Sequence, residues 1–483
     1  MPVLTLYDPN YHVGHLFMEC MKKRPNAICQ IDAATGAQES NESVLQRSVR
    51  LARCFRRLGL RPGDVLALGG RNHLDLHIPY YAALMNGLPI SGVDPLFKYD
   101  EIKSHFQISR PKVAFCEKET FADYKEAARV LELDTFVFTF DGESSMKEFI
   151  EKYDDCKSID DFEPAIFDLD KVYLWLASTG GTGGILKLAA IKHKVWLHKV
   201  LNFVMNLYKN ADDGFSENDR SKSVLNISPI HWISGLFNAL KSIISNQIKV
   251  QTSALLTTEH LIDIINNYKP ASTLMSPSLI TSILKHEKKC DLTSFDSLLI
   301  TEKCSSILFL VDPVTGKDIT APNTPGELWN KPTCFSEYYN NPDETALVFS
   351  EDGYYKTGDI LYRDEKDNFF FVERLKMLIK YRNYHIIPLE LEEVIRTHPG
   401  VQDVSVTGIP HAVDGDWPVA CVVTKPGAKV LAKEIEDLVA DKLSDSKRLR
   451  GGVIFMDQLP YMSTGKLARG KLRQMVIDIK NKI

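Results

Sequence analysis

The chain has 483 residues, of which 44% are hydrophobic and 25% are charged, and its formal net charge is -5. At about 150 residues per domain, this length predicts two to four structural units. The composition excludes the strongly basic surface typical of nucleic-acid-binding proteins and the highly charged, apolar-poor composition of disordered chains.

The apolar segments are too short to cross a membrane. HIPYYAALMNGLPISGV is broken by polar and turn-forming residues before it reaches the roughly 18 apolar residues that a span needs. The start, MPVLTLYDPNYHVGHLF, lacks a basic region and a small-residue cleavage site, and the nine cysteines are scattered without a CxxC pair. We therefore expect an intracellular protein with reduced thiols, either cytoplasmic or peroxisomal, although Asn481-Lys482-Ile483 is not the SKL address.

The first 180 residues alternate between helical and strand patterns. ESVLQRSVRLARCFRRLGL has the helical period, whereas DVLALGG, KVAFCE, DTFVFTF and KVYLWLA are short runs rich in β-forming residues. This alternation is typical of α/β proteins, in which helices flank a parallel sheet.

A glycine-rich loop follows the last of these strands, in the stretch LASTGGTGGILK. It fits neither GxxxxGK[ST] nor GxGxxG, so neither of the common nucleotide-binding folds is supported. Two interpretations remain equally open: a flexible loop with an incidental lysine, or a turn whose N–H groups, hydroxyls and lysine hold phosphate. In the second interpretation the ligands are Thr179, Gly180, Gly181, Thr182, Gly183 and Lys187.

The pattern changes after Asp312 to turns and short strands, and after DEKDNFFFVERLK to a compact α+β arrangement. There, the helical pattern PLELEEVIRTHP precedes the strand patterns VQDVSVTGIP and ACVVTKPG and the helical pattern AKEIEDLVADKLS. We predict a large N-terminal domain over 1–373, built of α/β subdomains and a small β-rich subdomain, and a smaller α+β domain over 374–483.

Several long segments closely resemble the adenylate-forming (ANL) superfamily of acyl-CoA synthetases, coumarate:CoA ligases and beetle luciferases. They are YYKTGDILYRDEKDNFFFVERLKMLIKYRNYHIIPLELEEVIRTHPGV and LPYMSTGKLARGKLRQM, with PIHWISGLF and KRLRGGVIFMDQLP in the matching order. The resemblance covers nearly the whole chain and is greatest to the insect luciferase-like acyl-CoA synthetases. It implies a mobile C-terminal domain and a glycine loop that closes over the β,γ-phosphates of ATP.

The resemblance also implies an ATP-dependent acid–thiol ligase. A carboxylic acid, either fatty or aromatic, attacks the α-phosphate of ATP, and coenzyme A then displaces AMP from the acyl-adenylate. The implied metal is Mg²⁺ carried by ATP, with no metal held by the protein alone. Two alternatives stay open: a catalytically impaired or truncated relative that binds nucleotide or acyl ligand weakly, and a luciferase-type monooxygenase.

The C-terminal motifs imply roles for five charged residues. Lys466 matches the lysine that reaches the α-phosphate and the attacking carboxylate, and Asp359 matches the acid that accepts both ribose hydroxyls. Arg374 matches a second ribose contact, Lys380 a lysine of the second half-reaction, and Glu373 the hinge, where the family usually has aspartate. Without the resemblance, these side chains are interpreted as solvated surface charges.

PIHWISGLF implies an acyl pocket lined by His231, Trp232 and Gly235, and an aromatic gate suits an apolar acid. For either His231 or Trp232 alone, packing into the core is an equally good interpretation.

Three departures from the family pattern concern the nucleotide site and the thiol route. The glycine loop is one residue longer than usual and lacks the usual proline, and Asn383 replaces a glycine beside the thiol route. Near residue 305 the chain omits several dozen residues that carry the S-G-G-A turn and the G-Y-G-x-T-E motif. Either Thr301 and Glu302 are a remnant of the T-E element, which makes Glu302 a nucleotide-site residue, or LLITEKCSS replaces the S-G-G-A turn and the T-E element is absent.

Overall fold

The computed structural model describes residues 8–155, 157–180, 186–197, 223–275, 277–300, 308–331, 335–382, 384–461 and 467–480. The chain forms two compact units. The first contains residues 1–181, 186–304 and 333–345, and the second contains 182–185, 305–332 and 346–483.

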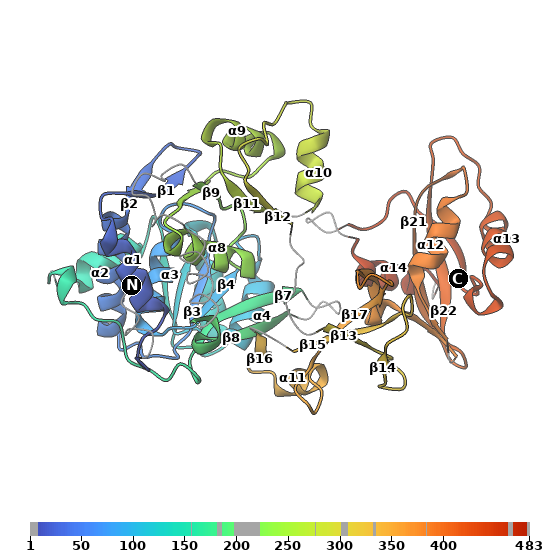
Figure 1. The fold of residues 1–483 in the computed structure, drawn as a ribbon, viewed down its shortest axis with the longest axis horizontal. Helices are drawn as coiled ribbons and strands as arrows, with labels where there is room; N and C mark the ends of the chain where they lie inside the picture. The colour runs from blue at the N-terminus through green and yellow to red at the C-terminus, as the bar shows by residue number, and fades with distance from the viewer. Residues whose placement is uncertain are drawn as a thin grey trace. The chain divides into compact units, whose positions relative to one another are not determined.

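A seven-stranded sheet forms one half of the first unit (Figure 1). Its parallel strands are short, and β3, β4 and β5 are buried along their whole length, because helices cover both faces of such a sheet. The two strands at one edge run antiparallel to their neighbours. In spatial order the strands are β16 (Phe335–Tyr338), β8 (Leu186–Lys192), β7 (Tyr173–Gly180), β4 (Ile90–Val93), β3 (Leu66–Gly69), β5 (Val113–Cys116) and β6 (Phe136–Thr139).

A six-stranded sheet forms the other half of this unit. Five of its strands are parallel, and β2 closes the edge as the antiparallel partner of β1. In spatial order they are β12 (Ser297–Ile300), β11 (Ser272–Met275), β9 (Ser223–Leu225), β10 (Ile248–Gln251), β1 (Ile28–Asp32) and β2 (Gln38–Ser40).

The helices of the first unit alternate with these strands along the chain. Side chains cap several of their N-termini, as when the Ser40 hydroxyl accepts a hydrogen bond from the Ser43 N–H at the start of α2. No described helix is long and apolar enough to cross a membrane. The helices are α1 (Val13–Lys23), α2 (Asn41–Arg57), α3 (His77–Asn86), α4 (Tyr99–Ser109), α5 (Phe121–Val130), α6 (Met146–Tyr153), α8 (Ile233–Ile244), α9 (Thr258–Tyr268) and α10 (Pro277–Lys285), followed at the boundary of the two units by α11 (Pro342–Val348).

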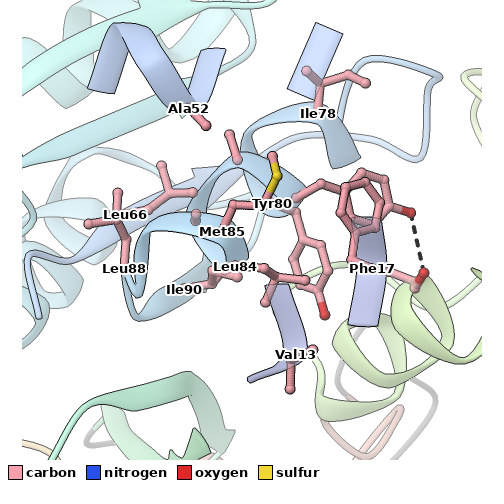
Figure 2. Packing of buried hydrophobic residues seen from close by; sticks show 14 of the residues in the cluster. Val13, Phe17, Ala52, Leu66, Ile78, Tyr80, Leu84, Met85, Leu88 and Ile90 are labelled. Atoms are coloured by element: carbon pink, nitrogen blue, oxygen red, sulfur yellow. Dashed lines mark hydrogen bonds between the residues drawn. The ribbon is translucent and has the colours of Figure 1, made fainter. Parts of the chain in front are cut away.

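The largest hydrophobic core surrounds α3, all of whose residues are buried. Figure 2 shows Tyr80, Leu84 and Met85 of this helix packed with Phe17 of α1 and Ile90 of β4. The buried Tyr80 hydroxyl donates a hydrogen bond to the Leu236 carbonyl oxygen at 2.9 Å and accepts one from the Trp175 indole N–H at 3.2 Å, so both its donor and its acceptor are used. This core therefore joins α3 to α1, α8 and the seven-stranded sheet.

The second unit contains two five-stranded sheets and three helices. The first sheet is antiparallel, in the order β14 (Asp318–Ile319), β13 (Leu308–Val311), β15 (Gly326–Asn330), β17 (Tyr355–Arg363) and β18 (Phe369–Arg374). The second has the order β20 (Tyr384–Ile386), β19 (Ile379–Tyr381), β22 (Gly415–Thr424) and β21 (Val401–His411), with β23 (Gly452–Phe455) parallel to β22. Its helices are α12 (Pro388–Arg396), α13 (Ala432–Lys442) and α14 (Arg469–Lys480).

The predicted fold class is confirmed, and each segment given a pattern in the sequence forms the expected element. ESVLQRSVRLARCFRRLGL contains α2, and PLELEEVIRTHP contains α12. The boundary at 373/374 remains a prediction.

The structure buries one ionisable side chain, Lys249, that no sequence pattern predicted to be buried. Lys249 of β10 is 2% exposed, and its Nζ lies 2.9 Å from His77 Nδ1 and 3.5 Å from the Tyr81 hydroxyl. Burial lowers the pKa of Lys249 to about 7, although Cys29 and Glu39 act in the opposite direction. Burial, reinforced by the nearby lysine, also lowers the pKa of His77, so that neutral imidazole is the available acceptor.

Lys249 makes the stability of the chain depend on pH. Its pKa rises from about 7 in the folded chain to 10.5 in the unfolded chain, so between these values the unfolded chain binds a proton that the folded chain does not. The free energy of unfolding therefore increases with pH in this window. We expect the free energy of unfolding of wild type, measured by urea denaturation, to increase relative to that of Lys249→Met as the pH rises from about 7 to about 9.5. A difference between the two proteins that does not change with pH would contradict this.

Candidate functional site

The described part of the glycine loop is its stem. Thr179 and Gly180 end β7, and Lys187 is the second residue of β8. Thr179 pairs directly with Lys187, and its hydroxyl donates a hydrogen bond to the Lys187 carbonyl oxygen at 3.2 Å. Gly181, Thr182 and Gly183 lie outside the described residues. The loop thus leaves from the carboxyl end of β7, where α/β sheets commonly bind ligands.

The side chain of Lys187 contacts one neighbour on its own sheet and one on helix α11. Its Nζ forms an ion pair with the Glu344 carboxylate and lies 5.0 Å from the centre of the Tyr338 ring. Only 12% of the Lys187 side chain is exposed. The predicted phosphate ligand therefore has an internal counter-ion in this structure.

The predicted acyl-pocket residues lie near the end of β4. His231 Nε2 is 3.4 Å from the Asp94 carboxylate, and the Trp232 residue is 47% exposed at the start of α8. Burial lowers the pKa of His231, and Asp94 acts to raise it. The structure thus brings a largely buried imidazole and a half-exposed indole together.

Two glycines allow this close packing. A Cβ on Gly92 would lie 2.4 Å from the His231 Cα, and one on Gly235 would lie 2.1 Å from the Pro229 carbonyl oxygen. The Gly92 carbonyl oxygen also accepts a hydrogen bond from Ser178 at 3.3 Å. Gly92 therefore links the stem of the glycine loop to the His231 segment, because only a residue without a side chain fits between them.

Asp359 and Arg374 face each other across the β17–β18 hairpin in direct register. Arg374 Nε lies 2.7 Å from Asp359 Oδ1, and Arg374 Nη1 donates to the Thr357 carbonyl oxygen at 3.2 Å. The Asp359 side chain is 25% exposed and that of Arg374 is 48% exposed. A carboxylate fixed in this way and still reached by solvent can accept hydrogen bonds from two hydroxyl groups, so the pair fits a ribose.

Buried polar contacts fix the backbone of β17 just before Asp359, where the pairing of β15 with β17 is irregular. Gly358 adopts φ +69°, and its N–H donates to Glu327 Oε1 at 3.0 Å. The other oxygen of Glu327 accepts from the Trp329 indole at 2.9 Å. The left-handed conformation favours glycine here, and Glu327 holds the backbone that presents Asp359.

The predicted hinge residue, Glu373, is anchored from the opposite face of β18. One carboxylate oxygen accepts from the Arg374 N–H at 2.9 Å, and the other lies 3.6 Å from Arg469 Nη2. Arg469 Nη1 also donates to Glu392 at 2.9 Å, and Glu392 is 2% exposed. Glu392 further accepts hydrogen bonds from Ser405 Oγ and from the Val406 N–H. The buried carboxylate thus accepts hydrogen bonds from Arg469 and from two neutral donors, and Arg396 Nη2 lies 3.7 Å from its Oε2.

The remaining predicted residues are only partly described. Lys380 is exposed in the middle of β19. Lys466, Glu302 and Asn383 lie outside the described residues. Among the side chains that the structure describes, no group of three or more histidines, cysteines and acids could hold a metal ion.

Together these features define an α/β protein with a loop stem suited to phosphate and a hairpin suited to ribose. The family model described as "AMP-binding enzyme" matches residues 17–308, and that of the "AMP-binding enzyme C-terminal domain" matches 390–466. The chain belongs to the AMP-binding enzymes of the adenylate-forming superfamily, a family that includes acid–CoA ligases. The resemblance found in the sequence is thus confirmed.

Known proteins similar to the chain span almost its whole length. Luciferin 4-monooxygenase of Photinus pyralis is 28% identical over 517 aligned positions, which cover 94% of this chain and 92% of the relative. The 4-coumarate–CoA ligase-like protein 1 of Arabidopsis thaliana is 26% identical and covers 94% of this chain and 92% of the relative. The first alignment is longer than the 483-residue chain, so the relative has residues at positions where this chain has none.

Solved structures share the fold. ATP-bound MatB from Rhodopseudomonas palustris matches with a TM-score of 0.80 at 20% identity, over 97% of this chain and all of the other. The o-succinylbenzoate CoA synthetase of Bacillus subtilis with its acyl-adenylate matches with a TM-score of 0.72 at 19% identity, over 96% of this chain and 98% of the other.

Sequence reasoning missed several residues that shape these sites: Asp94, Glu344, Glu327 and Arg469. Each acts through a partner far away in the sequence, so no local spacing signals the contact. Arg469 alone offered a signal, since it lies three residues after the predicted catalytic lysine.

Arg469 should stabilise the C-terminal part of the second unit more than an exposed arginine does. Arg469→Met leaves the buried Glu392 without its nearest cation, so we expect the free energy of unfolding to fall by about 3–5 kcal/mol. Arg473→Met is the matched control on the same helix, because Arg473 is 44% exposed and pairs with Asp416 at 2.9 Å. That change should cost at most about 1 kcal/mol. Equal losses in urea denaturation would contradict the assignment.

Proposed function

We propose that the chain is an ATP-dependent acid–thiol ligase that forms an acyl-adenylate and then an acyl-CoA thioester. The observation that carries the proposal is the cross-strand pair of Asp359 and Arg374, with a Nε–Oδ1 distance of 2.7 Å. Its carboxylate suits the two ribose hydroxyls of ATP and AMP. The family membership supports it, as do the ATP and the acyl-adenylate bound in the similar structures.

The first half-reaction joins two anions, so cations must offset the charge that builds on the α-phosphate. The acid's carboxylate attacks the α-phosphorus, and pyrophosphate leaves with the electron pair of the broken P–O bond. We assign the α-phosphate and carboxylate contact to Lys466 and the β,γ-phosphate contacts to the glycine loop and Lys187. A Mg²⁺ ion bound with ATP would add Lewis-acid charge at the phosphates.

The second half-reaction transfers the acyl group to a thiol, for which we propose coenzyme A. The thiolate attacks the acyl carbon, and AMP leaves with its phosphate oxygen. We propose that the domain after residue 373 turns about Glu373 between the two steps and brings Lys380 to the site. A lysine suits such a role because it is a point charge on a long stem.

The acid is proposed to be fatty or aromatic. Trp232 offers an exposed apolar face, and burial, opposed by Asp94, lowers the pKa of the adjacent His231. A neutral imidazole and an indole favour an uncharged apolar tail over a charged one.

Pyrophosphate exchange tests the ligase. Wild type should exchange labelled pyrophosphate into ATP only when a suitable fatty or aromatic acid is added. Lys466→Ala should lower this rate about a hundred- to thousandfold, because it removes one charge contact made in the transition state. Lys471→Ala, which removes an exposed lysine of α14, should leave the rate unchanged. No exchange with any acid would support instead a relative that only binds ligands.

Nucleotide binding tests the ribose assignment apart from catalysis. Asp359→Asn should raise the Kd for AMP about ten- to hundredfold, because charged hydrogen bonds to the ribose become neutral ones. Asp367→Asn, in the exposed turn of the same hairpin, keeps a residue that tolerates its φ of +61° and should not change the Kd. Equal AMP affinities for wild type and Asp359→Asn, measured by calorimetry, would remove Asp359 from the site.

Similarity to luciferin 4-monooxygenases supports a second candidate, an oxygenase that uses its adenylate. The motifs that carry the proposal do not specify oxygen chemistry, since both activities share the adenylate. Light emission with ATP and luciferin, in the absence of coenzyme A, would favour this candidate.

A further inference from the structure

Four side chains share one face of the sheet beside the glycine loop. Directly opposed residues of an antiparallel pair project to the same side, so Thr179 of β7 and Lys187 of β8 are neighbours there. Ala189, two residues further along β8, lies on that face and pairs with Tyr338 of β16. The Lys187 ammonium accordingly lies 5.0 Å from the Tyr338 ring centre.

Glu344 is delivered to this face by a rigid turn between β16 and α11 (Figure 1). The Asn341 side chain caps α11 by accepting from the Glu344 N–H at 3.3 Å. Thr345 Oγ accepts from the Tyr338 N–H at 3.0 Å and donates to the Asn341 carbonyl oxygen at 2.8 Å. These contacts fix the position of Glu344 relative to Tyr338. The Glu344 carboxylate pairs with the Lys187 ammonium.

The pair lies where solvent screening is reduced. The Lys187 side chain is 12% exposed and the Glu344 side chain is 33% exposed. An ammonium group has three donors, so Lys187 can meet a phosphate oxygen while it still contacts Glu344. The carboxylate would then lie within a few ångströms of the phosphate, and the two negative charges would repel each other at close range.

We propose that Glu344 is a specificity-determining residue that competes with the terminal phosphates of a nucleotide for Lys187. This inference rests on the proposed function, because it assigns Lys187 to the β,γ-phosphates. It predicts that Glu344 weakens the binding of ATP and pyrophosphate, which bear those phosphates, and leaves AMP unaffected. Glu344 thus lowers the preference for the triphosphate and assists the release of pyrophosphate after adenylate formation.

Calorimetry with Mg²⁺ and each of ATP, pyrophosphate and AMP tests this directly. Glu344→Gln keeps an oxygen that can accept from Lys187 and removes only the charge. We expect its Kd for ATP and for pyrophosphate to fall about tenfold and its Kd for AMP to change less than about twofold. Asp343→Asn removes the same charge from the adjacent, exposed position of α11 and should change none of the three.

A double-variant cycle isolates the role of Lys187. If Glu344 acts through Lys187, Glu344→Gln in the Lys187→Gln background should no longer tighten ATP binding. The inference would be overturned if Glu344→Gln bound ATP and pyrophosphate no more tightly than wild type, or if its affinity for AMP rose equally. It would also be overturned if Asp343→Asn had the same effect, or if neither protein bound ATP or pyrophosphate. Absence of acid-dependent exchange in wild type, with the binding pattern intact, would overturn the ligase function and leave the role of Glu344 standing.

Discussion

The register of the β17–β18 hairpin is the constraint on which the candidate nucleotide site depends. It sets Asp359 against Arg374 and, one position further, Ile360 against Glu373. Because side chains alternate across a strand, the ribose-directed pair and the hinge glutamate lie on opposite faces of the same two strands. A shift by one residue would exchange these faces, so the hairpin fixes the positions of the proposed ribose contact and of the proposed hinge together. The left-handed Gly358 of β17 and the buried Glu327 hold that register at its start.

In the first unit, the candidate site depends on backbone segments that pack unusually close together. Parallel strands that are buried on both faces leave room for ligands mainly beyond their carboxyl ends, where β4 and β7 bring the His231 segment and the glycine-loop stem together. Gly92 and Gly235 are required because neighbouring backbone atoms occupy the space of a Cβ. The site therefore depends as much on missing side chains as on the polar groups that it presents.

Three ionisable side chains that are shielded from water are stabilised by different kinds of partner. Glu392 is compensated by Arg469, Arg396 and two neutral donors, whereas Lys249 is held among neutral partners, and its low pKa reflects burial. Lys187 is paired with Glu344 beside the loop that is proposed to meet phosphate. Of these three, only the Lys187–Glu344 pair lies beside the proposed site of an anionic ligand, which can take the place of Glu344. An ion pair therefore stabilises the fold at Glu392, whereas at Lys187 we propose that it lowers the affinity for phosphate.

The sequence by itself determined the α/β fold class, the order of the elements and the family, because periodicity, turn residues and extended motifs are local properties of the chain. Through the family resemblance it also predicted that Asp359 and Arg374, 15 positions apart in the chain, act in one site. Only the tertiary structure showed that they pair across a hairpin. It also showed that Arg469 contacts both Glu373 and Glu392, and that Glu344 forms an ion pair with Lys187. Each of these contacts joins residues whose distance in space is set by strand register and packing, and sequence spacing carries no information about either.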